Sequence, residues 1–97
     1  MKRAYYVHYY RNFGNTYNLY WAPDGEAVPA SWERITRKAA ISLCIRERDA
    51  RRQDPAFSGY GDTRIYPAAW ASVDPYNVLC GPYTMDGPYI VEGPANV

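Results

Sequence analysis

Two runs of alternating side chains, joined by a short turn-forming segment, constrain the fold of this chain most. Residues 3–11 read RAYYVHYYR and residues 16–21 read TYNLYW, and both runs are rich in residues that favour β-strands. Residues 12–15 between them read NFGN, and Asn and Gly accept the positive φ angles of a hairpin turn. The pattern therefore predicts an antiparallel β-hairpin.

Side chains alternate between the two faces of a strand, so this hairpin presents two sets of residues. The more apolar set should join the core and comprises Tyr5, Val7, Tyr9, Tyr17, Leu19 and Trp21. The opposite set comprises Tyr6, His8, Tyr10, Thr16, Asn18 and Tyr20. If nothing covers the opposite set, its tyrosines form an exposed aromatic platform; the alternative is a fold in which the C-terminal segment covers them.

A helix over residues 37–53 is predicted to pack on the apolar face of the hairpin. Thr36 suits the N-cap, the run contains good helix formers, and the Asp-Pro pair at 54–55 ends it. The apolar stripe of this helix comprises Ala40, Ile41, Cys44 and Ile45, widened by Leu43. Residues 31–35 are ambiguous, since Ser31 also suits an N-cap and residues 32–35 suit a short third strand.

The last third of the chain has a different composition. Residues 63–66 are typical of another strand, ended by Pro67, and Ile65 should extend the core. Residues 67–97 contain five Pro and three Gly, which indicates an extended segment wrapped on the body with one edge strand. We therefore expect one α+β domain over residues 1–97, with an antiparallel sheet built on the hairpin, one main helix and a Pro/Gly-rich C-terminal segment.

Length and composition indicate how many domains the chain forms and in which cellular compartment it is expected. A chain of 97 residues with 47% hydrophobic residues is the size of one folded domain and too apolar to be disordered. No apolar run approaches the roughly 18 residues of a membrane span, and residues 1–5 lack the apolar region of a secretory signal. Two cysteines without a Cys-rich spacing favour a reducing compartment. We expect a cytoplasmic protein with no membrane partner.

The charge of the chain is nearly balanced but unevenly distributed. The net charge is +1, so direct binding of nucleic acid through overall charge is not expected. Residues 1–52 hold ten Lys/Arg and five Asp/Glu, a balance of +5, whereas residues 53–97 hold one Arg and five Asp/Glu, a balance of −4. The end of the predicted helix carries Arg46, Arg48, Arg51 and Arg52. We favour a solvated face, partly paired with the acidic segment, over phosphate contact for these arginines.

Residue patterns that carry catalysis or bind metals are missing from the sequence. His8 is the single histidine, which excludes metal sites built on a His pair and most catalytic triads. Cys44 and Cys80 form no CxxC pair, and the GYG at residues 59–61 follows a helix and so lacks the context of a phosphate-binding loop. We therefore expect no enzyme activity, no cofactor, no metal and no small-molecule substrate.

The residues best suited to bind a partner are the tyrosines of the aromatic platform and the carboxylates of the C-terminal segment. Tyrosine is favoured at protein interfaces, and carboxylates that no nearby Lys or Arg neutralises steer a chain toward a basic groove. The candidate partner-binding residues are Tyr6, Tyr10, Tyr20, Asp74, Asp86 and Glu92.

With its hairpin, one helix, irregular end, many tyrosines and no catalytic motif, the chain resembles the small proteins of phages and mobile elements, of which anti-CRISPR proteins are the best known. The resemblance is one of size and style, and no functional residue is carried over from it. It implies a phage-encoded inhibitor that binds a bacterial CRISPR–Cas effector complex and occludes its nucleic-acid site. The alternatives are a small nucleic-acid-binding module that uses the aromatic face and the Arg-rich helix, and an enzyme with a dispersed site.

Overall fold

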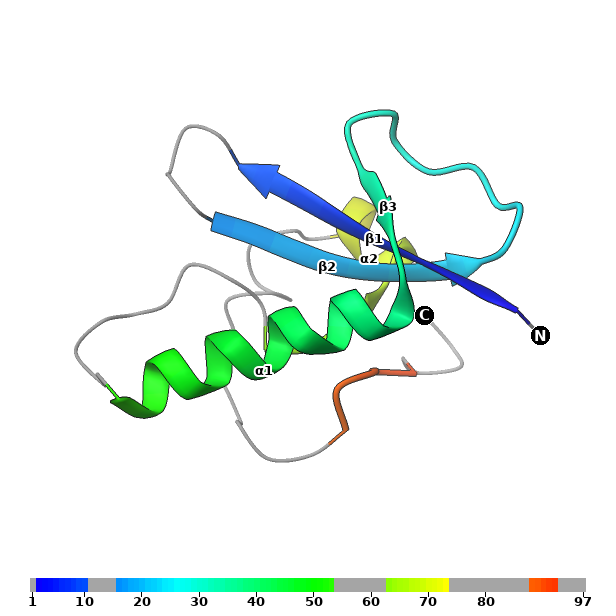
Figure 1. Cartoon of the computed structure of the whole chain (residues 1–97). Coiled ribbons are helices and arrows are strands. Elements are labelled where there is room, and N and C mark those ends of the chain that lie inside the picture. The colour runs from blue at the N-terminus through cyan, green and yellow to red at the C-terminus, as the bar shows by residue number, and fades with distance from the viewer. Residues whose placement is uncertain (1, 11–15, 54–62, 74–87, 93–97) are drawn as a thin grey trace.

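A computed structural model describes residues 2–10, 16–53, 63–73 and 88–92 of the chain (Figure 1). The elements follow the order β1, β2, β3, α1, β4, α2. Their bounds are Arg3–Tyr10 for β1, Thr16–Pro23 for β2, Glu33–Ile35 for β3, Arg37–Gln53 for α1, Tyr66–Pro67 for β4 and Ala69–Val73 for α2. The fold is α+β, as predicted.

The four strands form one mixed sheet in the order β3-β1-β2-β4. β1 pairs antiparallel with β2, with Tyr5 opposite Trp21 and Val7 opposite Leu19, which confirms the predicted hairpin and the predicted sharing of one face by these residues. β3 adds antiparallel to the free edge of β1, so the short third strand weighed for residues 32–35 is present at residues 33–35. β4, by contrast, runs parallel to β2.

The prediction of a purely antiparallel sheet is therefore wrong for β4. The chain leaves β2, forms β3 and α1, and returns to the β2 edge in the direction of β2; a crossover of this length permits parallel pairing. Ile65 then forms a parallel bridge with Ile90, through hydrogen bonds of 2.7 and 2.9 Å to the backbone of residues 89 and 91. The 88–92 segment thus continues the sheet beyond β4.

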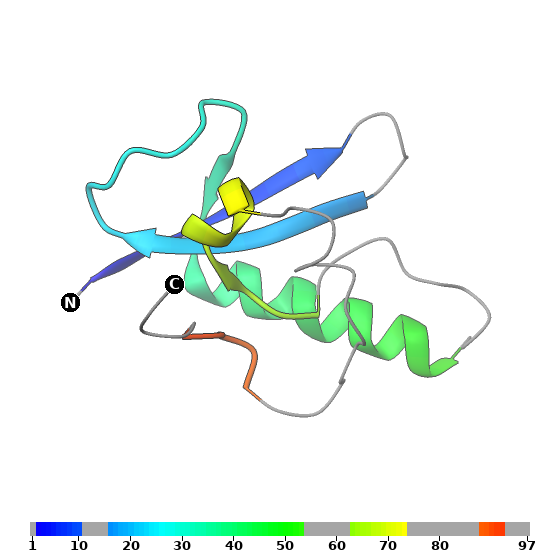
Figure 2. The same cartoon turned by 180° about the vertical axis from the view of Figure 1, so that it is seen from behind.

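The helix α1 has the predicted bounds and the predicted cap. The hydroxyl of Thr36 accepts a hydrogen bond of 3.0 Å from the amide of Ala39, which satisfies one of the free donors at the start of the helix. Figures 1 and 2 show α1 along one side of the β1–β2 hairpin and α2 on the other side. We call these the α1 face and the α2 face of the sheet.

The α1 face holds the main core. Its buried residues are Tyr5, Val7, Tyr17, Leu19, Ala40, Cys44 and Ile65, all predicted. The predicted core residues Trp21, Ile41 and Ile45 are half-buried. Tyr9 is the exception, because it lies at the rim of the hairpin, packed edge-on against Tyr17, and is 48% exposed. The prediction that Tyr9 is a core residue is wrong.

The short helix α2 was not predicted. It begins two residues after Pro67, in the stretch that was expected to be extended. Its sequence, AWASV, contains two alanines, which are strong helix formers, but a Pro-rich composition around it concealed this local preference. Among the described helices, none is both long and apolar enough to cross a membrane.

Truncation of Leu19 tests the assignment of the α1 face. Leu19 is 0% exposed, so Leu19→Ala should lower the free energy of unfolding by about 2–5 kcal/mol, through lost burial and the cavity left behind. Urea unfolding followed by circular dichroism measures the change. Tyr9→Ala, on the exposed rim of the same face, is the control and should cost clearly less. A loss below about 1 kcal/mol for Leu19→Ala would contradict the assignment.

Candidate functional site

The tyrosines predicted to form an exposed platform are covered on the α2 face. Tyr6 is 7% exposed and Tyr20 is 1% exposed. The ring of Trp32 stacks on Tyr20 at 4.3 Å between centroids and 9° between planes, and lies 6.2 Å from the ring of Tyr6. The prediction that Tyr6 and Tyr20 form an exposed surface is therefore wrong, because the half-buried Trp32 packs over both rings.

Within the part of the chain that the structure describes, the cover comes mainly from the connection between β2 and β3. A second buried cluster on this face joins Ala4, Tyr6 and Ala22 to Val28, Trp32 and Ala68. Val28 and Trp32 precede β3, whereas Ala68 is the contribution of the C-terminal third of the chain. The sequence suggested the C-terminal segment as a cover, and no periodic pattern marked the β2–β3 connection as one. An isolated Trp next to a turn was the available signal.

The remaining predicted tyrosine and two of the predicted carboxylates are not described. Tyr10 belongs to β1, but its side chain lies outside the described residues, as do Asp74 and Asp86. His8, between the tyrosines, is half-buried, and burial lowers the pKa of its imidazole. Of the predicted residues that the structure describes, it thus brings together Tyr6 and Tyr20, and it places them in the interior.

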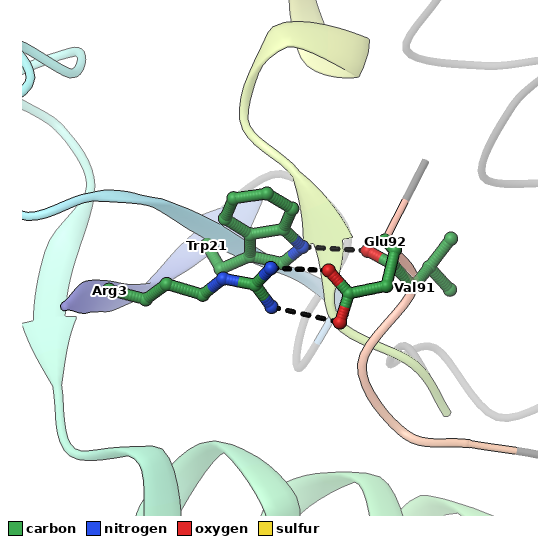
Figure 3. Close-up of polar contacts among 4 residues, drawn as sticks. All are labelled: Arg3, Trp21, Val91 and Glu92. Carbon is green, nitrogen blue, oxygen red and sulfur yellow. Dashed lines mark hydrogen bonds and ion pairs between the residues drawn. The ribbon is translucent and has the colours of Figure 1, made fainter. Parts of the chain in front are cut away.

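Glu92, the remaining predicted residue, is bound to a cation from the other end of the chain (Figure 3). Nη1 of Arg3 donates a hydrogen bond of 3.1 Å to Oε1 of Glu92, and Nη2 of Arg3 pairs with Oε2. This hydrogen bonding raises the pKa of Arg3 and lowers the pKa of Glu92. We expected no neighbour in sequence to neutralise Glu92, and the fold supplies one that lies 89 positions away.

Arg3 is held in place by Trp21. The guanidinium carbon of Arg3 lies 3.9 Å from the centroid of the Trp21 ring, a cation–π contact. The indole Nε1 of Trp21 in turn donates a hydrogen bond of 2.7 Å to the carbonyl of Val91. The 88–92 segment is also tied to α1, since Arg48 hydrogen-bonds to the hydroxyl of Tyr89. Contacts to β1, β2, Ile65 and α1 therefore hold this segment against the body.

A basic depression lies where β1 begins and where β3 passes into α1. It has a volume of about 480 Å³ and is lined by Lys2, Arg3, Ala4, Tyr5, Asp24, Arg34, Ile35, Thr36 and Arg37. Four of these residues are cations and one is an anion. Lys2 and Arg37 are exposed, and no ion pair is described for either. Arg34 pairs with Asp24 at 3.3 Å, with both side chains largely exposed.

Topology assembles this basic depression from segments far apart in the chain. Lys2 and Arg3 lie at the start of β1, Asp24 follows β2, and Arg34 and Arg37 flank the junction of β3 with α1. The antiparallel pairing of β1 with both neighbours brings these three points to one end of the sheet (Figure 1). The positive end of the α1 dipole lies at the same place. Sequence reasoning missed this site because no local run contains it.

The arginines at the end of α1 differ in how exposed their side chains are. Arg48 is half-buried and bound to Tyr89 and Asp49, whereas Arg46 and Arg52 are exposed. The side chain of Arg51 is outside the described residues. Lys and Arg side chains bind phosphate oxygens readily, so both this end and the basic depression suit anions.

Among the residues that the structure describes, no three His, Cys, Asp or Glu side chains come together as a metal site would require.

Comparison with known protein families, with curated proteins and with solved structures finds no match for this chain.

The pH dependence of stability tests the Arg3–Glu92 ion pair. Because the pKa of Glu92 is lowered by folding, the pair stabilises the chain above the ordinary glutamate pKa of about 4.3, and this stabilisation is lost as the pH falls through the lower pKa of the folded state. Glu92→Gln should melt below the wild type at neutral pH, and the difference in Tm should shrink in acid. Glu33→Gln, at an exposed carboxylate in β3, is the control. A difference that stays constant with pH would contradict the pairing.

Proposed function

We propose that this chain is a non-catalytic binding module that holds the phosphate backbone of a nucleic acid in the basic depression. The observation that carries the proposal is the convergence of Lys2, Arg3, Arg34 and Arg37 around one open hollow, whose described lining holds one carboxylate, Asp24, and whose Arg3 pairs with Glu92 at the rim. Lys and Arg side chains bind nucleic acid by displacing counterions from its phosphates. A net charge of +1 for the whole chain conceals this local excess of positive charge.

Such binding should be tolerant of base sequence. Tyr6 and Tyr20, which would stack on bases if they were exposed, are buried under Trp32 and Val28. Contacts to phosphate position a protein on nucleic acid but read no bases. The proposed role is therefore that of a small module that attaches to nucleic acid in a bacterial cytoplasm, with modest affinity and strong dependence on salt.

Titration with oligonucleotides tests this function. We expect a labelled oligothymidylate to bind, and to bind more weakly at about 200 mM than at about 50 mM salt. Contact of Lys2, Arg34 and Arg37 with phosphate, with Arg34 exchanging Asp24 for the ligand, predicts a slope of about −2 for log K against log salt, since each contributes roughly 0.7 on a single strand. Arg34→Gln/Arg37→Gln should reduce that slope by about 1.4. Fluorescence anisotropy measures both quantities.

The matched control is Arg46→Gln/Arg52→Gln, which removes the same charge from the far end of α1. This control should leave the slope nearly unchanged, because both residues lie outside the basic depression. Absence of binding to single- and double-stranded oligonucleotides at low salt would overturn the proposed function. An equal loss in the control would move the site to the Arg-rich end of α1.

A second candidate function is the one implied by resemblance, an inhibitor that binds a bacterial CRISPR–Cas effector complex. Exposure of Tyr9 favours it: this side chain is 48% exposed on the rim of the hairpin, and exposed tyrosines are enriched at protein interfaces. Tyr9 lies six residues along β1 from Arg3, roughly 20 Å away, so this surface is separate from the basic depression.

The two candidates separate in an interference assay. If the chain is such an inhibitor, it should reduce target cleavage by a CRISPR–Cas complex in proportion to its amount, and Tyr9→Ala should weaken that effect by about tenfold or more, as central interface tyrosines do. The control is Arg34→Gln/Arg37→Gln, which should inhibit as the wild type does. Unchanged inhibition by folded Tyr9→Ala would exclude Tyr9 from the interface.

A further inference from the structure

We infer that Glu92 is an intramolecular stand-in for phosphate, occupying the Arg3 guanidinium that an anionic ligand in the basic depression would otherwise bind. This inference rests on the proposed function and assigns a regulatory contact to the same site. It makes Arg3 a phosphate-binding residue that is masked in the unbound chain, and Glu92 its internal competitor.

The geometry of the ion pair is that of phosphate recognition. Both terminal nitrogens of Arg3 face the two oxygens of Glu92, one nitrogen to each oxygen (Figure 3). Two adjacent phosphate oxygens present the same pair of acceptors, and the planar guanidinium fork binds carboxylate and phosphate in this bidentate way. A phosphate group can therefore replace the carboxylate with little rearrangement of Arg3.

Arg3 is also prepared for a ligand before Glu92 leaves. The guanidinium carbon of Arg3 lies over the Trp21 ring, 3.9 Å from its centroid, and the hydrogen bond from Trp21 to the carbonyl of Val91 fixes the indole. The Arg3 side chain is 22% exposed, so part of its entropy is already lost in the unbound chain. An ordered cation loses less entropy on binding than a free lysine does.

Glu92 can leave without disrupting the fold. Its side chain is 67% exposed, and an exposed ion pair of this kind contributes little to stability. The segment that carries it stays attached through the bridge of Ile90 to Ile65 and the hydrogen bond of Tyr89 with Arg48. Exchange of Glu92 for a ligand phosphate is therefore a local side-chain movement at the edge of the basic depression.

The consequence is a site with two levels of affinity. With Glu92 in place, the ligand meets Lys2, Arg34 and Arg37, and Arg34 already shares its charge with Asp24. With Glu92 displaced, Arg3 adds a fourth cation and a negative charge moves away from the phosphates. Removal of the Glu92 carboxylate should thus strengthen binding, which is the opposite of what a purely structural ion pair would do.

A mutational cycle tests this inference with labelled oligothymidylate as the probe. Glu92→Gln should tighten binding by about two- to fivefold, the equivalent of an exposed ion pair, and steepen the salt slope by about 0.7. Arg3→Gln should bind nearly as the wild type does, because in the wild type the contact that the ligand gains with Arg3 is offset by the loss of the Arg3–Glu92 pair. Adding Arg3→Gln to Glu92→Gln should cancel the gain.

Asp49→Asn is the matched control, because Asp49 is also a partly exposed carboxylate paired with an arginine, Arg48, at 3.3 Å. It lies 12 residues along α1 from Arg37, roughly 18 Å from the basic depression. A gain in Asp49→Asn equal to that in Glu92→Gln would reduce the effect to net charge and overturn the inference. So would a wild type that binds while Glu92→Gln binds no better. No binding by any variant would instead overturn the proposed function.

A measurement on the wild type keeps the test independent of any variant's folding. The carboxyl carbon of Glu92, followed by NMR, reports its pKa with and without saturating oligothymidylate. Loss of Arg3 to the ligand should raise the pKa of Glu92 toward its ordinary value. A pKa that stays low in the complex would show that Arg3 remains bound to Glu92 and would overturn the inference.

Discussion

The β1–β2 hairpin carries large apolar and aromatic side chains on both of its faces, so the fold must exclude water from both. On one face, Leu19 and Tyr5 pack against α1; on the other, Tyr20 stacks on Trp32. A two-stranded ribbon cannot bury either face alone. The helix, the β2–β3 connection and the C-terminal segments all serve as covers for this one element, and their positions follow from it (Figure 2).

Covering both faces leaves the ends of the sheet as the places where polar side chains gather. The antiparallel turns of the chain bring the start of β1, the end of β2 and the start of α1 to one end, and the cations there cannot be buried without partners. Arg3 and Arg34 each find a carboxylate, whereas Lys2 and Arg37 remain exposed in the basic depression. The proposed anion site thus results from the arrangement of elements that buries both faces of the hairpin.

The 88–92 segment links the core to that site. Its apolar residues extend the sheet and the main core, while Glu92 reaches the rim of the basic depression. A segment held at several points can exchange one exposed ion pair without leaving the body, since the other contacts persist. This is why the same five residues can contribute both to the closure of the core and to control of a surface charge.

Local pattern alone determined the hairpin and its two faces, the helix with its Thr36 cap, and most of the main core, because alternation and capping depend on neighbours in sequence. The tertiary structure alone decided that Tyr6 and Tyr20 are covered, since the residue that covers them, Trp32, lies on a connection with no periodic pattern. It also decided the parallel pairing of β4, the exposure of Tyr9 and the pairing of Arg3 with Glu92. Each of these depends on which distant segments meet, and no spacing along the chain encodes that meeting.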